Sequence, residues 1–415
     1  MIVPGQPEVD YEYYTAAQYN DITTTINGVP ATFVIANDAV GRRASITYPN
    51  GVTTNYAAYD DANHLMTLQH LNPANAVLES LNYTYAPNGN RISMDRQNVS
   101  MPRPAPASNI AFNAANQMQT FNANPIIYDG NGNMTSMTNN CGTTNYTWDA
   151  RNRLIGIIGF EADCSSLTAS FTYDALGRRI GKTINGRTIQ YVYDGNDIVQ
   201  EIENGLVSVN YIRTLNIDEP LARIAASPVI VRYYQTDALG SVIGLTDESG
   251  QMVTTYAYAA FGQMAMSGEI SDNPFQYTGR ENDNTGLYCY RARYYSPELQ
   301  GFISEDPIGL VGGINKFVYT LNNPTNHTDP SGLIVPPNLK PGGECIKCDY
   351  GEIADCIWNK PGTPPNLVAC TRCIMSDGAD QAACTQCGAS LTLNSAECIQ
   401  KNCHSGKRNA CGQCE

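Results

Sequence analysis

The sequence lacks several features that would place the protein in common functional classes. No apolar run approaches the ~18 residues that a membrane-spanning helix needs, so no membrane span is predicted. Basic residues are few: 25 Lys and Arg stand against 39 Asp and Glu, a formal net charge of −14. That balance argues against nucleic-acid binding by the body of the chain. The N-terminal residues MIVPGQPEVDYEYY have neither the basic nor the apolar segment of a Sec signal peptide.

Long helical patterns and large aromatic side chains other than tyrosine are also scarce. The chain has 2 Trp and 9 Phe but 26 Tyr, and 35 Gly and 23 Pro interrupt it. Glycine and proline spread along a chain in this way are typical of short strands joined by turns. The composition therefore predicts a mainly β protein.

Cysteine is scarce in most of the chain and concentrated at one end. Cys141, Cys164 and Cys289 precede residue 345, and the other eleven of the 14 cysteines lie from Cys345 onward. A short segment this rich in cysteine is typical of a fold held by disulfides or metal rather than by apolar burial. We therefore expect a large body and a small Cys-rich domain at 334–415, joined by a Pro-rich hinge at 335–343.

A degenerate phrase recurs along the body at intervals of 16 to 27 residues. It has an aromatic residue, then Asp or Asn, and then Gly or Asn a few residues later. This pattern predicts a strand that ends at the aromatic residue, a turn capped by the Asp or Asn side chain, and a second strand. Because one hairpin cannot bury its own face, the copies must associate into a continuous sheet. The copies are AYDDANHL, TYAPNGNRI, AFNAANQM, IYDGNGNM, TWDARNRL, TYDALGRRI and VYDGNDIV.

These phrases resemble the YD repeats of RHS (rearrangement hot spot) and teneurin-type proteins. The resemblance is strongest at 233–333, where YTGRE, LYCYRARYYSP, FISEDPIGL and NNPTNHTDPSGL follow in the order of the RHS-repeat-associated core domain. It implies a YD-repeat β-sheet region at 8–232, the core domain at 233–333, and a variable Cys-rich domain at 334–415.

The resemblance also implies an architecture and partners. In this family a β-hairpin ribbon spirals into a hollow shell, the core domain plugs one end, and the shell encloses a variable C-terminal segment that is often a toxin. Shell-forming members usually have far more repeat than this chain supplies, so a partner subunit or further RHS repeats would complete the shell. A cognate immunity protein and a secreted or cell-surface location are also implied.

Two carboxylates stand out at the end of the body. Residues Ile314–Leu321 (INKFVYTL) alternate like a strand, so we expect a hairpin that brings Asp306 and Asp329 face to face. Two carboxyl groups that share a proton can activate water and protonate a leaving amide nitrogen. Each Asp-Pro pair is also suited to a tight turn capped by the Asp side chain. The spacing leaves both interpretations open.

The family resemblance implies a self-cleaving aspartyl protease that acts only on itself, after the Leu of DPxGL. In this sequence the scissile bond is Leu333–Ile334. Members commonly have an Arg before the aromatic residue of the F-I-S phrase, where this chain has Gly301, and Arg291 and Arg293 are the candidates to replace it. Otherwise these two arginines and Arg280 are expected to pair with acidic residues of the body.

The Cys-rich domain contains four CxxC pairs. Two zinc sites of four thiolates each would use this spacing, because a CxxC turn points both thiolates at one metal. Disulfides are the alternative, and an odd number of eleven cysteines then leaves one thiol over. The domain has no metalloprotease, nucleophile-elbow or Walker motif. The candidate ligands are Cys345, Cys348, Cys370, Cys373, Cys384, Cys387, Cys411 and Cys414.

Two functions from different classes follow from the sequence. In the first, the chain is a shell and plug that carries a toxin-like effector and releases it by cutting after Leu333, in competition between bacteria or in host interaction. In the second, it is a structural or adhesive surface protein with a stapled C-terminal module and no catalysis.

Overall fold

The structure is a computed structural model that describes residues 3, 5–15, 18–97, 99–333, 345–348 and 403–406. It divides into two compact units, Met1–Val335 and Pro336–Glu415. In the second unit, β29 (Cys345–Cys348) pairs antiparallel with β30 (Cys403–Gly406).

The first unit is built from antiparallel strands in chain order. The N-terminal sheet has eight strands, β1 (Asp10–Thr15), β2 (Gln18–Ile26), β3 (Val29–Asn37), β4 (Arg43–Thr47), β5 (Thr53–Tyr59), β6 (Leu65–Leu71), β7 (Val77–Tyr85) and β8 (Arg91–Arg96). A sixteen-stranded sheet, the wall sheet, contains β9 (Ala111–Phe112), β10 (Met118–Phe121), β11 (Asn124–Tyr128), β12 (Met134–Asn139), β13 (Gly142–Trp148), β14 (Leu154–Phe160), β15 (Ser166–Tyr173), β16 (Arg179–Ile184), β17 (Arg187–Asp194), β18 (Asp197–Glu203), β19 (Leu206–Arg213), β20 (Pro220–Ala226), β21 (Val229–Thr236), β22 (Val242–Thr246), β23 (Met252–Tyr258) and β24 (Met264–Gly268).

The segment at 273–333, here called the plug, is mostly irregular. Its small sheet contains β25 (Glu281–Asn282), β26 (Tyr288–Tyr290), β27 (Arg293–Ser296) and β28 (Gly301–Phe302), and its 3-10 turns are η1 (Tyr277–Gly279), η2 (Gly309–Gly312) and η3 (Thr320–Asn322). Among the described residues these 3-10 turns are the only helices, and none could cross a bilayer. The prediction of a mainly β fold built from a hairpin ribbon is confirmed. The domain boundary expected at 232/233 falls within β21, which pairs on both sides with its neighbours.

The repeated phrase forms the expected turn. After Tyr173 ends β15, one carboxylate oxygen of Asp174 accepts hydrogen bonds from the backbone N–H groups of Leu176 and Arg178, both at 2.9 Å. Gly177 has a φ of +88°, a conformation that most side chains avoid. The Asp cap and the left-handed residue together reverse the chain into β16.

The turn after Tyr173 is also tied to the next repeat. The Arg178 guanidinium binds Asp174 at 2.8 Å and lies 5.1 Å from the centre of the Tyr193 ring, one repeat further along. The Tyr193 hydroxyl then donates to the carbonyl oxygen of Arg179 at 2.8 Å. The arginine that often ends the phrase therefore joins successive hairpins along one rim of the sheet.

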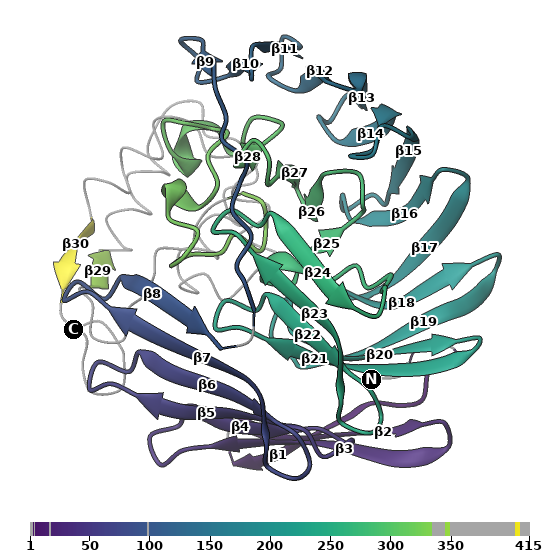
Figure 1. Ribbon diagram of the computed structural model, residues 1–415, viewed down its shortest axis with the longest axis vertical. Helices are drawn as coiled ribbons and strands as arrows, with labels where there is room; N and C mark the ends of the chain where they lie inside the picture. Colours follow the sequence, from purple (N-terminus) through teal and green to yellow (C-terminus); the bar gives the residue numbers. More distant parts are fainter. Residues whose placement is uncertain are drawn as a thin grey trace, which may run out of the picture. The chain divides into compact units, whose positions relative to one another are not determined.

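The wall sheet curves around the plug. In Figure 1 it runs from β9 at the top, down the right side, to β24 near the centre, with β25–β28 inside the curve. Tyrosines of both parts form one buried cluster, in which Tyr211 and Tyr256 of the wall sheet lie with Tyr288, Tyr290 and Tyr295 of the plug. The N-terminal sheet packs against β19–β21 through a second cluster. The wall sheet therefore has apolar contacts on both faces.

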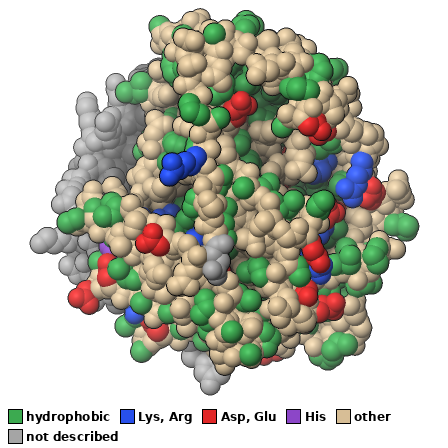
Figure 2. Space-filling model, viewed as in Figure 1, with side chains coloured by type: hydrophobic (Ala, Val, Ile, Leu, Met, Phe, Trp, Pro, Cys, Tyr) green, Lys and Arg blue, Asp and Glu red, His purple; other side chains and the backbone are tan. Residues whose placement is uncertain are grey.

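Charge is sparse on the face of the molecule drawn in Figure 2. On the face drawn in Figure 2, acidic and basic side chains are scattered among uncharged atoms and form no large patch of one sign. Buried charge pairs lie between wall and plug, where Arg179 and Lys182 of β16 both contact Asp283. The plug is thus attached to the wall by ion pairs as well as by aromatic packing.

The strand expected at Ile314–Leu321 does not form, and that prediction is wrong. The Asn315 side chain accepts a hydrogen bond from the backbone N–H of Phe317 at 3.0 Å, which turns the chain. Thr320 and Leu321 have positive φ angles, and Val318 makes a single bridge to Gly301. Local side-chain caps override the alternating pattern here.

Candidate functional site

Asp306 and Asp329 lie together in the plug although no hairpin joins them. Asp306 follows β28 and precedes η2, whereas Asp329 lies in the final turn of the described body. Their exposed fractions are 7% and 2%, and Arg293, the first residue of β27, is 3% exposed. The predicted pair of carboxylates is therefore close in space and buried.

Arg293 lies between the two carboxylates. Its Nη2 atom is 3.0 Å from Oδ2 of Asp306 and 3.4 Å from Oδ2 of Asp329. Its Nη1 donates to the carbonyl oxygen of Lys316 at 2.9 Å, and its guanidinium lies 3.6 Å from the centre of the Phe302 ring. These contacts fix the guanidinium plane, because each arginine donor has a set direction.

The segment around the predicted scissile bond reaches the same cluster. Nε of Arg293 donates to the carbonyl oxygen of Gly332. The backbone N–H of Leu333 donates to Oδ1 of Asp329 at 3.2 Å, and the Ser331 hydroxyl donates to the same oxygen at 3.1 Å. Leu333 is thus held by Asp329, and the preceding Gly332 by Arg293, while Ile334 lies outside the described residues.

A glycine marks the space between Asp306 and Leu333. A Cβ atom at Gly312 would lie 2.7 Å from Oδ2 of Asp306 and 3.2 Å from the carbonyl oxygen of Leu333. Both oxygens therefore border the same small volume, which only the absence of a side chain leaves open.

Burial is the main cause of the pKa shifts of Asp306 and Asp329. It raises the pKa of both Asp306 and Asp329 above the ordinary value, and the Arg293 guanidinium opposes the rise. The negative charge of Asp329 raises the pKa of Asp306 further. Two carboxyl groups shifted in this way can retain one proton at a milder pH than exposed aspartates would.

Both aspartates also serve as turn caps. Oδ1 of Asp306 accepts a hydrogen bond from the backbone N–H of Ile308 at 3.0 Å, and Oδ1 of Asp329 accepts one from the backbone N–H of Leu333 at 3.2 Å. The capping and catalytic interpretations therefore concern the same two carboxylates, with Oδ1 in the capping bonds and Oδ2 facing Arg293.

Two of the three arginines in the plug that the sequence singled out pair with an acidic residue of the wall, and the third pairs with the acidic residues of the site. Arg280 and Arg291 both contact Asp218 of the wall, as expected. Arg293 instead pairs with Asp306 and Asp329 of the plug, and so places a cation at the site. Gly301 lies in β28, where a Cβ would come within 3.0 Å of the Phe317 carbonyl oxygen.

The proposed metal ligands lie mostly outside the described residues. Cys345 and Cys348 are in β29, with Cys348 opposite Cys403 of β30 in the strand register. Within the described part of the chain, no group of three or more His, Cys, Asp or Glu side chains could hold a metal. The choice between zinc and disulfides in the C-terminal domain remains a prediction. The ligands outside the described residues are Cys370, Cys373, Cys384, Cys387, Cys411 and Cys414.

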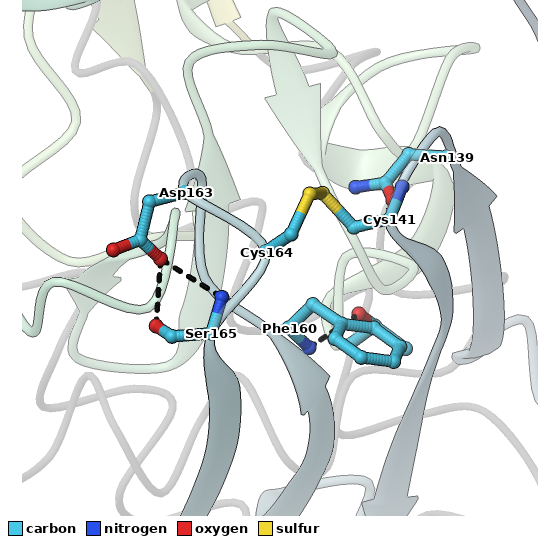
Figure 3. The surroundings of a disulfide bond; sticks show 7 residues. Asn139, Cys141, Phe160, Asp163, Cys164 and Ser165 are labelled. Carbon is cyan, nitrogen blue, oxygen red and sulfur yellow. Dashed lines mark hydrogen bonds between the residues drawn. A yellow bond between two sulfur atoms is a disulfide. The ribbon is translucent and has the colours of Figure 1, made fainter.

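A disulfide in the body was not anticipated. Cys141 follows β12 and Cys164 lies in the turn after β14, and the two are joined with a Cα–Cα distance of 5.1 Å (Figure 3). Their separation of 23 residues is close to one repeat, and this regularity is the signal that could have revealed the pair. The bond joins neighbouring hairpin loops of the wall sheet.

Curated relatives of the chain include toxins. It is 33% identical over 261 residues to the tRNA nuclease WapA of Bacillus subtilis strain 168, covering 61% of this chain and 11% of WapA. It is 31% identical over 239 residues to double-stranded DNA deaminase toxin A of Burkholderia cenocepacia strain H111, covering 50% of this chain and 16% of that protein. The chain thus spans a small part of the length of these relatives.

A solved structure shares the fold. The crystal structure of TcdB2-TccC3 matches with a TM-score of 0.59 and 20% identity, over 79% of this chain and 21% of that chain. The teneurin YD-shell family matches residues 53–324, which include β5–β24 and most of the plug. The chain therefore belongs to the RHS/YD-repeat family, with a teneurin-type YD shell.

Proposed function

We propose that this chain supplies wall and plug to a shell that carries a toxin-like C-terminal segment, and that it cuts itself at Leu333–Ile334 to free that segment. The observation that carries the proposal is the position of Arg293, between two buried carboxylates and bonded to the residue before Leu333. The curated relatives support the carrier role, because their names give different toxic activities, a tRNA nuclease and a DNA deaminase.

The chemistry is hydrolysis of one amide bond. The ionised member of the Asp306 and Asp329 pair accepts a proton from water, whose oxygen attacks the carbonyl carbon of Leu333. The protonated member gives its proton to the amide nitrogen of Ile334 as the C–N bond breaks. One water is consumed, and a carboxylic acid at Leu333 and an amine at Ile334 result, while the proton has passed from one aspartate to the other. Arg293 holds both carboxylates and the Gly332 carbonyl in place.

A structural or adhesive protein without catalysis is the second candidate. The capping bonds that Asp306 and Asp329 make to nearby backbone N–H groups favour it, since they give both residues a purely structural task. The two functions differ in one observable, the covalent state of the bond after Leu333.

The deciding experiment is intact-mass spectrometry of the denatured chain. The carrier function predicts two species that break at Leu333–Ile334, and a single full-length species in Asp306→Asn and in Asp329→Asn. Asp174→Asn, which alters a turn-capping aspartate of a YD repeat, is the matched control and should be cut normally. A full-length wild-type chain would exclude self-cleavage and leave the structural function.

Export and partners form the rest of the proposal. Disulfides persist in oxidising compartments, so the Cys141–Cys164 bond supports a secreted or cell-surface location. Further repeats or a partner subunit would complete the shell, and an immunity protein would protect a producing cell. Mass spectrometry with and without zinc chelator and reductant would distinguish zinc from disulfides in the domain at 334–415.

A further inference from the structure

We propose that Arg291 couples the wall sheet to the cleavage site, so that Leu333–Ile334 is cut efficiently only when the wall is packed against the plug. This inference rests on the proposed self-cleavage and assigns a positioning role to residues that lie outside the acidic pair. It is carried by the contacts of the hairpin tip between β26 and β27, which touches the wall on one side and the DPSGL segment on the other.

On the wall side, Arg291 makes several contacts. Its Nη2 lies 2.8 Å from Oδ1 of Asp197, the first residue of β18, and 2.7 Å from Oδ1 of Asp218, in the turn between β19 and β20. Its Nη1 donates to the other Asp218 oxygen at 3.0 Å, and its Nε donates to the Asn196 carbonyl at 3.2 Å. Side chains of two wall turns therefore fix this guanidinium.

On the site side, the same guanidinium holds the segment that contains the scissile bond. Nη1 of Arg291 donates to the carbonyl oxygen of Pro330, the residue after Asp329. The backbone N–H of Ala292 donates to the carbonyl oxygen of Ser331 at 3.2 Å. The next residue, Arg293, contacts both catalytic candidates. The hairpin tip thus fixes the backbone on which Asp329 and Leu333 lie.

The wall carboxylates are themselves anchored. Asp218 also binds Arg280 of the plug, and a Cβ at Gly279 would lie 2.4 Å from the Asp218 carbonyl oxygen, so the two segments are in close contact. Arg291 has a positive φ of 51°, which its contacts must stabilise. If the wall turns moved away, Arg291 would lose its counter-ions and Pro330 would lose a donor. Because a misplacement of about 1 Å can cost roughly a hundred-fold in rate, this loss would slow cleavage.

The test compares full-length chains refolded from denaturant, with cleavage followed over time by intact mass. Arg291→Ala should slow cleavage by about ten-fold to a hundred-fold. Arg187→Ala removes an exposed ion pair with Glu203 on the same wall sheet and should cut at the wild-type rate. Guanidinium ion at about 20 mM should partly restore Arg291→Ala, since it can occupy the vacated site, whereas a general loss of stability would not be restored. Cutting of folded Arg291→Ala at the wild-type rate would overturn the inference.

Hydrogen exchange of the 329–333 segment separates this inference from the proposed function. Arg291→Ala should speed exchange of the Leu333 amide relative to Arg187→Ala, and Asp197→Asn should do so to a smaller extent. If the wild-type chain is not cut, self-cleavage fails, and the coupling is judged on exchange alone. Equal exchange in Arg291→Ala and Arg187→Ala would then refute it. If Arg291→Ala does not fold, Arg291→Lys, which keeps the charge but not the fork of donors, replaces it in both measurements.

Discussion

Nη2 of Arg293 lies 3.0 Å from Oδ2 of Asp306, and both side chains are buried in the plug. The buried Arg293 contributes both to stability and to cleavage. Its removal leaves two buried carboxylates unpaired, which destabilises the fold, and it also frees the backbone at Gly332 that the side chain holds. The two contributions can be separated by substitutions that keep or remove the charge.

Arg293→Ala should destabilise the chain by about 3–5 kcal/mol, because it breaks a buried ion cluster. Arg293→Lys should cost less in stability, yet it should still slow cleavage strongly, because lysine cannot bind Asp306, Asp329 and the Gly332 carbonyl at once. Urea unfolding and the cleavage time course measure the two effects. Equal cleavage by Arg293→Lys and wild type would show that charge alone is sufficient.

Gly312→Ala probes the space beside the scissile carbonyl. The added methyl group would lie 2.7 Å from Oδ2 of Asp306, so either this carboxylate or Leu333 must shift. We expect cleavage to slow by about ten-fold or more, while the free energy of unfolding changes by about 1–2 kcal/mol. Gly130→Ala, where a Cβ would have nothing within 4 Å, is the control and should be cut like wild type. Unchanged cleavage of Gly312→Ala would place the reacting carbonyl elsewhere.

Arg178→Ala tests the tie between successive repeats. It removes the contact with the Tyr193 ring and the partly exposed ion pair with Asp174, together worth about 1 kcal/mol. Arg151→Ala, which changes an exposed arginine in the preceding YD turn, should be nearly neutral. Urea unfolding of both variants measures the difference. If Arg178→Ala and Arg151→Ala had equal free energies of unfolding, Arg178 would not contribute to the association of successive hairpins.

The repeats could be predicted from the sequence because each turn is determined locally. Tyr173, Asp174 and Gly177 lie within five residues, and their side chains or backbone angles alone set the turn. The same locality explains an error. The alternating letters of Ile314–Leu321 suggested a strand, but Asn315 caps a turn within its own neighbourhood.

The site was only partly accessible from the sequence. The family resemblance pointed to Asp306 and Asp329, but the choice of Arg293 over Arg291 as the cation depends on the backbone, because Arg291 lies in a turn with a positive φ and Arg293 begins β27. Those two residues are separated by one position, and they bind different partners, the acidic pair and the wall carboxylates. The Cys141–Cys164 bond could be predicted only from the pairing of four wall strands, β12 to β15, which brings the two loops together. Such long-range placement is not encoded in any short stretch of residues.

The buried His70 predicts how stability depends on pH. Its ring is fully buried between the N-terminal sheet and the wall sheet, where Nδ1 lies 2.9 Å from the Thr54 hydroxyl and Nε2 lies 3.1 Å from the Thr236 carbonyl oxygen. Burial lowers its pKa to about 4, from an ordinary value of 6.5. As the pH falls below 6.5, the unfolded chain binds a proton at this residue and the folded chain does not, so stability decreases until the pH reaches the folded pKa.

Between pH about 7.5 and about 5, His70 should therefore cost the fold about 2 kcal/mol. His70→Gln keeps a donor for the Thr236 carbonyl but does not titrate, so its loss of stability over this range should be smaller by that amount. Urea unfolding of both chains at the two pH values measures the difference. If both chains lost stability equally, the acid sensitivity would have to arise from other groups, and the contact between the two sheets would not depend on a neutral His70.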